Sequence, residues 1–280
     1  MMVGNPMPID LTHYSGIEQF GRAYRIMLSN DAHAPGSVDR VLAEGMVRIC
    51  PSTAPDLYRD YTSTDLRYEM GSRPTLEAHL RSIASGRSSA KAIIQAIAEF
   101  CSRLTKKVRT QKLDDALFGG TEEEIIERGS DWCTDVARVG CILCQVSGIP
   151  ARLAMLFDTS KAYSGHVIVE AYRTGVWGAF DPLTTVIYRH PGGRPSTVWE
   201  LMNRPQLVKA HWRGPVTLYT TPDQFRAAAI SNYFVWDRPK YSYAVTHVNR
   251  YYRSILEMSD RGWPGGLRWL HGEADPESGT

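Results

Sequence analysis

Hydrophobic residues recur at spacings of three and four along much of the first half of the chain. This spacing predicts helices over residues 17–29, 37–50 and 75–84. A further helix is expected to begin after Ser88 or Ser89, because either hydroxyl can cap it. The first half of the chain is therefore predicted to be mostly helical.

The pattern changes in the middle of the chain, where one segment is apolar on nearly every side. Residues 133–146 contain few polar side chains and are followed by a Ser-Gly-Ile-Pro sequence, which commonly ends a helix. A helix of this kind lies in the interior of a domain. Just before it, Thr121 and Glu124 have the spacing of a capping box, which predicts a short helix that ends at Gly129.

Runs of β-branched and apolar residues follow this helix. Residues 153–157 and 166–172 are predicted to be strands, and 176–183 is predicted to return after a tight turn at Thr174 and Gly175. We expect the last two strands to form an antiparallel hairpin that packs on the buried helix.

Short elements alternate in the last third of the chain. The pattern predicts a helix start at 196–200, a strand over 215–221 and helices over 221–229 and 245–258, with a frayed tail behind them. Five of the seven tryptophans lie after residue 190, and we expect them to pack mainly in a core.

Composition is that of an ordinary globular chain and argues against several classes of protein. Of the 280 residues, 43% are hydrophobic and 22% are charged, which suits one or two domains with a sizeable core. The formal net charge of +2 argues against a dedicated nucleic-acid-binding protein. No apolar run reaches the ~18 residues needed to cross a bilayer, which argues against a membrane protein.

The N-terminus and the cysteines indicate a cytoplasmic protein. The first residues lack the basic start and apolar stretch of a secretory signal peptide. The five cysteines are an odd number, which does not suit a disulfide framework, and a reducing cytoplasm would keep them as thiols. Cys141 and Cys144 form a C-x-x-C inside the apolar segment with no second pair, so we expect them in the core rather than around zinc.

Cys133 is the cysteine whose position suggests chemistry. It falls at about the second position of the buried helix, behind an expected N-cap at Ser130 or Asp131. The backbone amides and the helix dipole at such a position favour an anion, and the thiolate is the form in which a cysteine acts as a nucleophile.

The predicted hairpin brings a base and a carboxylate together. A two-residue turn pairs Arg173 with Val176, so that His166 falls opposite Leu183. His166 and Asp181 are then diagonal neighbours on one face, whereas a slip of one residue would separate them. With the cysteine as nucleophile, the histidine would act as base and the aspartate would orient it.

Four motifs in this order resemble the transglutaminase-like superfamily of papain-type cysteine enzymes. The motifs are DWCTD at 131–135, SGIPAR at 147–152, GHV at 165–167 and FDP at 180–182. The resemblance covers residues 119–188 and implies that Cys133, His166 and Asp181 are the catalytic residues. The chain departs from the common pattern at Val167, where many members have an aromatic residue, and at Leu183, where a small hydroxyl residue is frequent.

The resemblance implies an α+β fold in which a central helix packs on an antiparallel sheet. We therefore expect a helical N-terminal region at 1–84, a transglutaminase-like catalytic core at 85–190 and a C-terminal extension packed on it at 191–280. Asp135 and Arg152, from the first two motifs, are expected to make local structural bonds.

The expected chemistry is acyl transfer through a thioester on the cysteine, without a metal or organic cofactor. Three outcomes stay open: hydrolysis of a peptide or amide bond, transfer of the acyl group to an amine, and a catalytically silent binding scaffold. The acyl donor would be a peptide, a protein or a small molecule. Trp132 would line the acyl pocket or anchor the helix start, and the Cys133 amide would contribute to the oxyanion hole.

Overall fold

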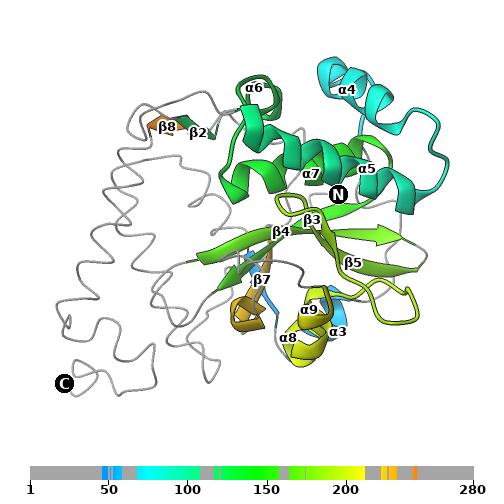
Figure 1. Ribbon diagram of the computed structural model, residues 1–280, viewed down its shortest axis with the longest axis vertical. Coiled ribbons are helices and arrows are strands. Elements are labelled where there is room, and N and C mark those ends of the chain that lie inside the picture. Colours follow the sequence, from blue (N-terminus) through cyan, green and yellow to red (C-terminus); the bar gives the residue numbers. More distant parts are fainter. Residues whose placement is uncertain are drawn as a thin grey trace, which may run out of the picture.

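The computed structural model describes residues 46–49, 51, 53–58, 68–107, 117–119, 121–157, 164–173, 175–211, 222–225, 227–231 and 242–244. A six-stranded antiparallel sheet forms the middle of the described part, with one group of helices on each face (Figure 1). This arrangement confirms the α+β fold that the sequence predicts.

The sheet has the strand order β1-β7-β3-β4-β5-β6. Its strands are β1 (Met46–Arg48), β7 (Ala227–Ser231), β3 (Ala151–Phe157), β4 (Ser164–Arg173), β5 (Val176–Asp181) and β6 (Val186–Ile187). The hairpin of β4 and β5 has the predicted register, with Arg173 opposite Val176. A separate two-stranded sheet joins β2 (Leu117–Gly119) to β8 (Ser242–Ala244).

The larger helical layer carries the buried helix. Its elements are α4 (Pro74–Ala84), α5 (Ala90–Ser102), the 3₁₀ helix η3 (Arg103–Lys107), α6 (Glu122–Arg128) and α7 (Cys133–Val146). Ser89 caps α5 by accepting a hydrogen bond from the Ala92 amide, and Thr121 and Glu124 form the predicted capping box of α6. From Thr134 onward every residue of α7 is buried, as its apolar sequence predicts.

The opposite face of the sheet carries smaller helices (Figure 1). These are α3 (Ala54–Leu57), α8 (Val198–Asn203), α9 (Pro205–His211) and the 3₁₀ helix η5 (Pro222–Phe225). Thr197 and Glu200 form a second capping box at the start of α8, within the predicted helix start at 196–200.

The alternation of side chains along the strands divides the core into two clusters. Leu153 and Met155 of β3 pack in the cluster that includes α7, whereas Ala154 and Leu156 pack in the cluster that includes α8. Both faces of the central strands are therefore buried.

A buried ion pair ties the smaller helices to the sheet. Arg152 Nη2 lies 2.7 Å from Glu170 Oε2, and the Arg152 guanidinium lies over the Trp177 ring at 3.9 Å from its centroid. The Val198 amide at the start of α8 donates to Glu170 Oε1 at 2.7 Å. The expectation of a local bond for Arg152 was wrong, because its partner lies on the neighbouring strand.

Two of the predicted helices are wrong, because parts of both segments form strands that are far apart in the sequence and pair in the sheet. Residues 46–48, within the predicted helix 37–50, form β1, and the predicted helix 221–229 is replaced by η5 and the start of β7. β7 is rich in alanine, but it lies between β1 and β3, so tertiary pairing overrides helix propensity. The predicted elements at 17–29, 215–221 and 245–258 and the C-terminal tail lie outside the described residues.

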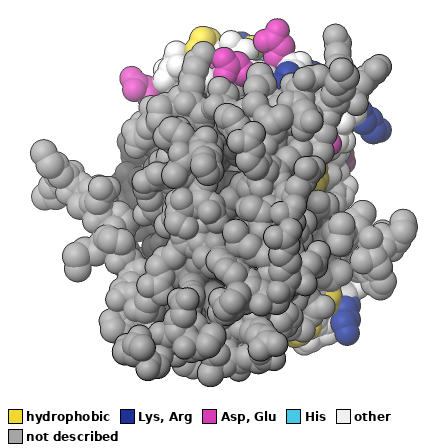
Figure 2. Space-filling model, turned by 90° about the vertical axis from the view of Figure 1, so that its left-hand side faces the viewer, with side chains coloured by type: hydrophobic (Ala, Val, Ile, Leu, Met, Phe, Trp, Pro, Cys, Tyr) yellow, Lys and Arg dark blue, Asp and Glu magenta, His cyan; other side chains and the backbone are white. Residues whose placement is uncertain are grey.

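The sheet draws strands from all three predicted regions of the chain, and the division at 84 and 190 stays a prediction. Figure 2 shows both acidic and basic described side chains at the margin of one face, in keeping with the small net charge. Among the described residues, no helix has the length and apolar character of a membrane span.

Candidate active site

Cys133 is the first residue of α7 and is partly exposed. The N-cap residue is Trp132, which makes no side-chain capping bond, so the expected cap at Ser130 or Asp131 was wrong. Ser130 acts differently: its hydroxyl accepts from the Trp132 amide at 3.1 Å and donates to Asp135 Oδ2 at 3.1 Å. The helix therefore begins one residue later than expected, which places the thiol in its first turn.

His166 and Asp181 lie together as the hairpin register predicts. His166 is the third residue of β4, Asp181 is the last residue of β5, and both side chains are fully buried. His166 Nε2 lies 2.9 Å from Asp181 Oδ2. The Cys133 side chain also acts on His166, because it contributes to raising the pKa of the imidazole. Because Nε2 faces the carboxylate, a thiol that exchanged a proton with His166 would do so at Nδ1.

The surroundings of His166 favour its charged form. Burial alone would lower the pKa of His166, but the charge and hydrogen bond of Asp181, followed by those of Cys133, raise it to about 10. His166 is therefore an imidazolium at neutral pH.

Asp181 is held by two donors from the turn that follows it. The Leu183 amide donates to Oδ1 at 2.9 Å, and the Thr184 hydroxyl donates to Oδ2 at 2.7 Å. Together with His166 these donors satisfy both oxygens of a fully buried carboxylate, which would be costly to bury without partners.

A buried charge network supports the start of α7 from behind. Asp135 Oδ2 accepts from Arg128 Nη2 at 2.8 Å, and Asp135 Oδ1 lies 3.7 Å from Arg138 Nη1. Arg138 in turn forms an ion pair with Glu122 of α6. Asp135 thus makes the local bonds that its motif predicts, and it fixes α7 to α6.

Gly140 lets α7 approach the turn behind Asp181 closely. A Cβ atom at this position would lie 3.2 Å from the Pro182 side chain, which is closer than most such contacts in proteins. The helix and the turn therefore hold each other in place across this contact.

The other described cysteines differ from Cys133 in their surroundings. Cys101, Cys141 and Cys144 are fully buried in the core cluster around α7, as predicted for the C-x-x-C. Burial raises the pKa of each of these three thiols. Among the described residues, no three metal-ligating side chains gather in one place.

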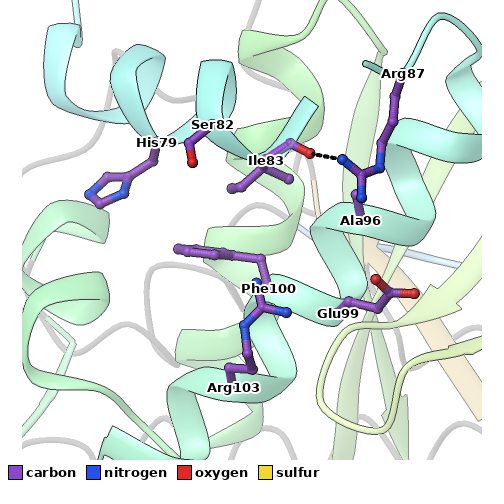
Figure 3. A pocket seen from close by; sticks show the side chains of 8 residues that line it. All are labelled: His79, Ser82, Ile83, Arg87, Ala96, Glu99, Phe100 and Arg103. Atoms are coloured by element: carbon purple, nitrogen blue, oxygen red, sulfur yellow. Dashed lines mark hydrogen bonds between the residues drawn. The ribbon is translucent and has the colours of Figure 1, made fainter. Parts of the chain in front are cut away.

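A cavity of about 280 Å³ lies between α4 and α5, apart from the three predicted catalytic residues (Figure 3). His79 and Phe100 lie at one side of it, and Arg87 donates to the Ile83 carbonyl at 2.7 Å. None of the residues that line it is a predicted site residue. The remaining predicted substrate residue, Trp132, is partly exposed beside Cys133.

The described residues form an α+β fold, with Cys133 at the start of the helix that packs on the sheet. Residues 78–182 match the family model of the Transglutaminase-like superfamily, so this segment is a transglutaminase-like domain. The matched segment runs from α4 to the turn after β5 and includes Cys133, His166 and Asp181. The resemblance seen in the sequence motifs is thereby confirmed. Comparisons with curated proteins and with solved structures gave no match.

Proposed function

We propose that this protein is a cysteine-dependent acyl-transfer enzyme that hydrolyses a peptide or amide bond through a thioester on Cys133. One observation carries the proposal: His166 Nε2 lies 2.9 Å from the buried carboxylate of Asp181, and Cys133, at the first position of α7, contributes to raising the pKa of the same imidazole. The groups have the order and roles of a nucleophile, a base and an orienting acid.

The chemistry follows from the charge state of the pair. The Cys133 thiolate attacks the substrate carbonyl carbon, and the His166 imidazolium gives its proton to the leaving nitrogen, which departs as an amine. His166, now neutral, takes a proton from water as the water oxygen attacks the thioester. Collapse of this second intermediate releases a carboxylic acid and restores the thiolate and the imidazolium.

The start of α7 also suits the stabilisation of an oxyanion. The Cys133 amide, at the first helical position, has no acceptor within α7, and the N-cap residue Trp132 makes no side-chain bond to the helix. A developing negative charge beside this helix start would meet backbone N–H groups and the positive end of the helix dipole.

The donor in this proposal is a peptide, a protein or a small molecule with an amide or ester carbonyl. An amine in place of water would lead to amide-forming transfer by the same first half-reaction. We also propose a cytoplasmic location, because all four described cysteines are free thiols.

The first experiment tests the nucleophile with iodoacetamide. Limited alkylation followed by peptide mapping should label Cys133 well before Cys101, Cys141 and Cys144, and the variant Cys133→Ala should lose the fast-labelled site. Preferential labelling of any other cysteine would refute the proposed nucleophile.

The second experiment tests the fate of the acyl group. Intact mass spectrometry after exposure to pools of peptide amides and esters should show an adduct that wild type forms and Cys133→Ala does not. Release in water identifies a hydrolase, and a faster release into an amide product when a primary amine is added identifies a transferase. A chain that reacts with iodoacetamide but forms no acyl adduct would fit the binding scaffold.

A further inference from the structure

The turn between β5 and β6 contains a residue with a positive φ angle. Thr185 has φ 63°, in the left-handed region that β-branched residues rarely adopt, and it is the only non-glycine residue with positive φ among those described. Its hydroxyl donates to the carbonyl of Thr184 at 2.6 Å. A strained residue persists only where its surroundings hold it, and such residues concentrate at functional sites.

The strained turn fixes the direction of the Thr184 side chain. Pro182, at the start of the turn, is packed against Gly140 of α7, and the bond from Thr185 anchors the Thr184 carbonyl. The Thr184 hydroxyl then reaches Asp181 Oδ2 at 2.7 Å. An ionised carboxylate can only accept hydrogen bonds, so the hydroxyl is the donor.

Thr184 and His166 use the same carboxylate oxygen. His166 Nε2 lies 2.9 Å from Asp181 Oδ2, while the Leu183 amide holds the other oxygen at 2.9 Å. The Leu183 amide alone would leave the carboxylate free to turn about that contact. A second donor on Oδ2 fixes the carboxylate plane and keeps one lone pair directed at the imidazole.

We propose that Thr184 is a positioning residue for the catalytic carboxylate: its hydroxyl holds Asp181 Oδ2 in the orientation that faces His166 Nε2. This inference rests on the proposed function. It assigns to a residue outside the three predicted catalytic residues the task of keeping the thiolate and imidazolium paired.

The test compares Thr184→Val, which removes only the hydroxyl from a side chain of the same shape, with Thr184→Ser, which keeps it. Thr105→Val is the matched control, because the Thr105 hydroxyl makes a similar bond to the Ser102 carbonyl, away from the site. The measurement is the iodoacetamide alkylation rate of Cys133 from pH 5 to pH 10, followed by mass spectrometry of its peptide.

We expect the acid limb of the Thr184→Val profile to move up by about 0.5–1.5 pH units, as for the loss of one hydrogen bond to a charged group. Alkylation near pH 6 should then be about 3–30-fold slower than in wild type, and the two rates should converge near pH 10, where the thiolate forms without its partner. Thr184→Ser and Thr105→Val should follow the wild-type profile.

Among the residues that the structure describes, few titratable groups act on His166 and Asp181. Cys133 and Asp181 act on His166, and Tyr188 lies near Asp181. Burial, and then the Asp181 charge, raise the pKa of Tyr188 well above its usual value, so Tyr188 stays neutral across the titration.

The possible results separate the two proposals. A wild-type profile for Thr184→Val, an equal loss at every pH, or a failure of serine to restore the rate would overturn the positioning role while leaving Cys133 as the nucleophile. Absence of preferential Cys133 labelling in wild type would overturn both. If Thr184→Val lowers the melting temperature strongly, Thr184→Ala at this partly exposed position is measured in its place.

Discussion

The neighbouring helices α6 and α7 begin in opposite ways. At α6 the Thr121 hydroxyl accepts from the Glu124 amide at 3.3 Å, and the Glu124 carboxylate accepts from the Thr121 amide at 2.7 Å. At α7 the N-cap residue Trp132 makes no such bond. The first helix therefore satisfies two backbone amides at its start with its own side chains, whereas the second begins without a side-chain cap of this kind.

The difference shows how a helix start can be stable and still available for chemistry. Asp135 in the first turn of α7 is fixed by Arg128 and Ser130, behind the position of Cys133. These bonds hold the start of α7, although its N-cap residue provides no capping side chain. The bonds of Asp135 to Arg128 and Ser130 therefore take the place of a side-chain cap at this helix start.

Loss of the charge that faces His166 should have the largest effect on the α7 site. Asp181→Asn keeps the shape of the side chain but removes the charge that stabilises the imidazolium. We expect turnover to fall by roughly 10–10³-fold, or about 1.4–4 kcal/mol of barrier. The measurement is the rate of acyl turnover of wild type and Asp181→Asn, with Cys133→Ala as the inactive reference. Full activity in Asp181→Asn would show that Asp181 does not orient His166.

Loss of the ion pairs that Asp135 makes at the start of α7 should lower the free energy of unfolding. Asp135→Asn removes a buried charge that faces Arg128 and Arg138, and we expect a loss of about 2–3 kcal/mol in the free energy of unfolding. Glu127→Gln, an exposed change on α6, is the control. Urea unfolding measures both. Equal stability in the two variants would mean that the α7 start does not depend on this network.

Sequence patterns predicted those parts of the site that depend on short spacings. The Thr-x-x-Glu spacing predicted the cap of α6, and a two-residue turn predicted the register that brings His166 to Asp181. These features depend on neighbours in the chain. Local hydrogen bonding and the two-residue period of a strand therefore fix them.

Other parts of the fold and of the candidate site depend on contacts between residues far apart in the sequence or on turns, which local patterns do not predict. β1 and β7 pair across nearly the whole described chain, and alanine-rich β7 carries no strand pattern of its own. The motifs did not point to Thr184, because the family pattern has its hydroxyl residue directly after the Asp-Pro, where this chain has Leu183. The Asp-Pro-Leu-Thr order, with a hydroxyl one residue later, was the available signal.

The charge at the α7 site should also make stability depend on pH. The pKa of His166 is raised in the folded protein, so its contribution is complete below the unfolded value near 6.5 and is lost as pH rises towards about 10. In Cys133→Ala, where Asp181 still raises the pKa, stability should fall by up to about 1.4 kcal/mol per pH unit above pH 6.5.

The control for this pH dependence is the combined variant Cys133→Ala and Asp181→Asn, because it removes the main cause of the raised pKa. The difference in unfolding free energy between the two proteins, measured from pH 6 to pH 10, cancels the other titrating groups. A constant difference across this range would contradict a raised pKa for His166.

The smallest expected effect is the loss of the α6 cap, which tests whether the start of α6 affects the start of α7. Thr121→Ala removes the side-chain cap of α6 and should cost about 1 kcal/mol of stability, or roughly 2–4 °C in melting temperature. Because α6 carries only structure, Cys133 alkylation should keep the wild-type rate and pH profile. Ser89→Ala, at the start of α5, is the matched cap removal. If Thr121→Ala slows alkylation and Ser89→Ala does not, the two helix starts are coupled through Glu122, which binds Arg138 of α7, and the α6 cap would then be part of the support for Cys133.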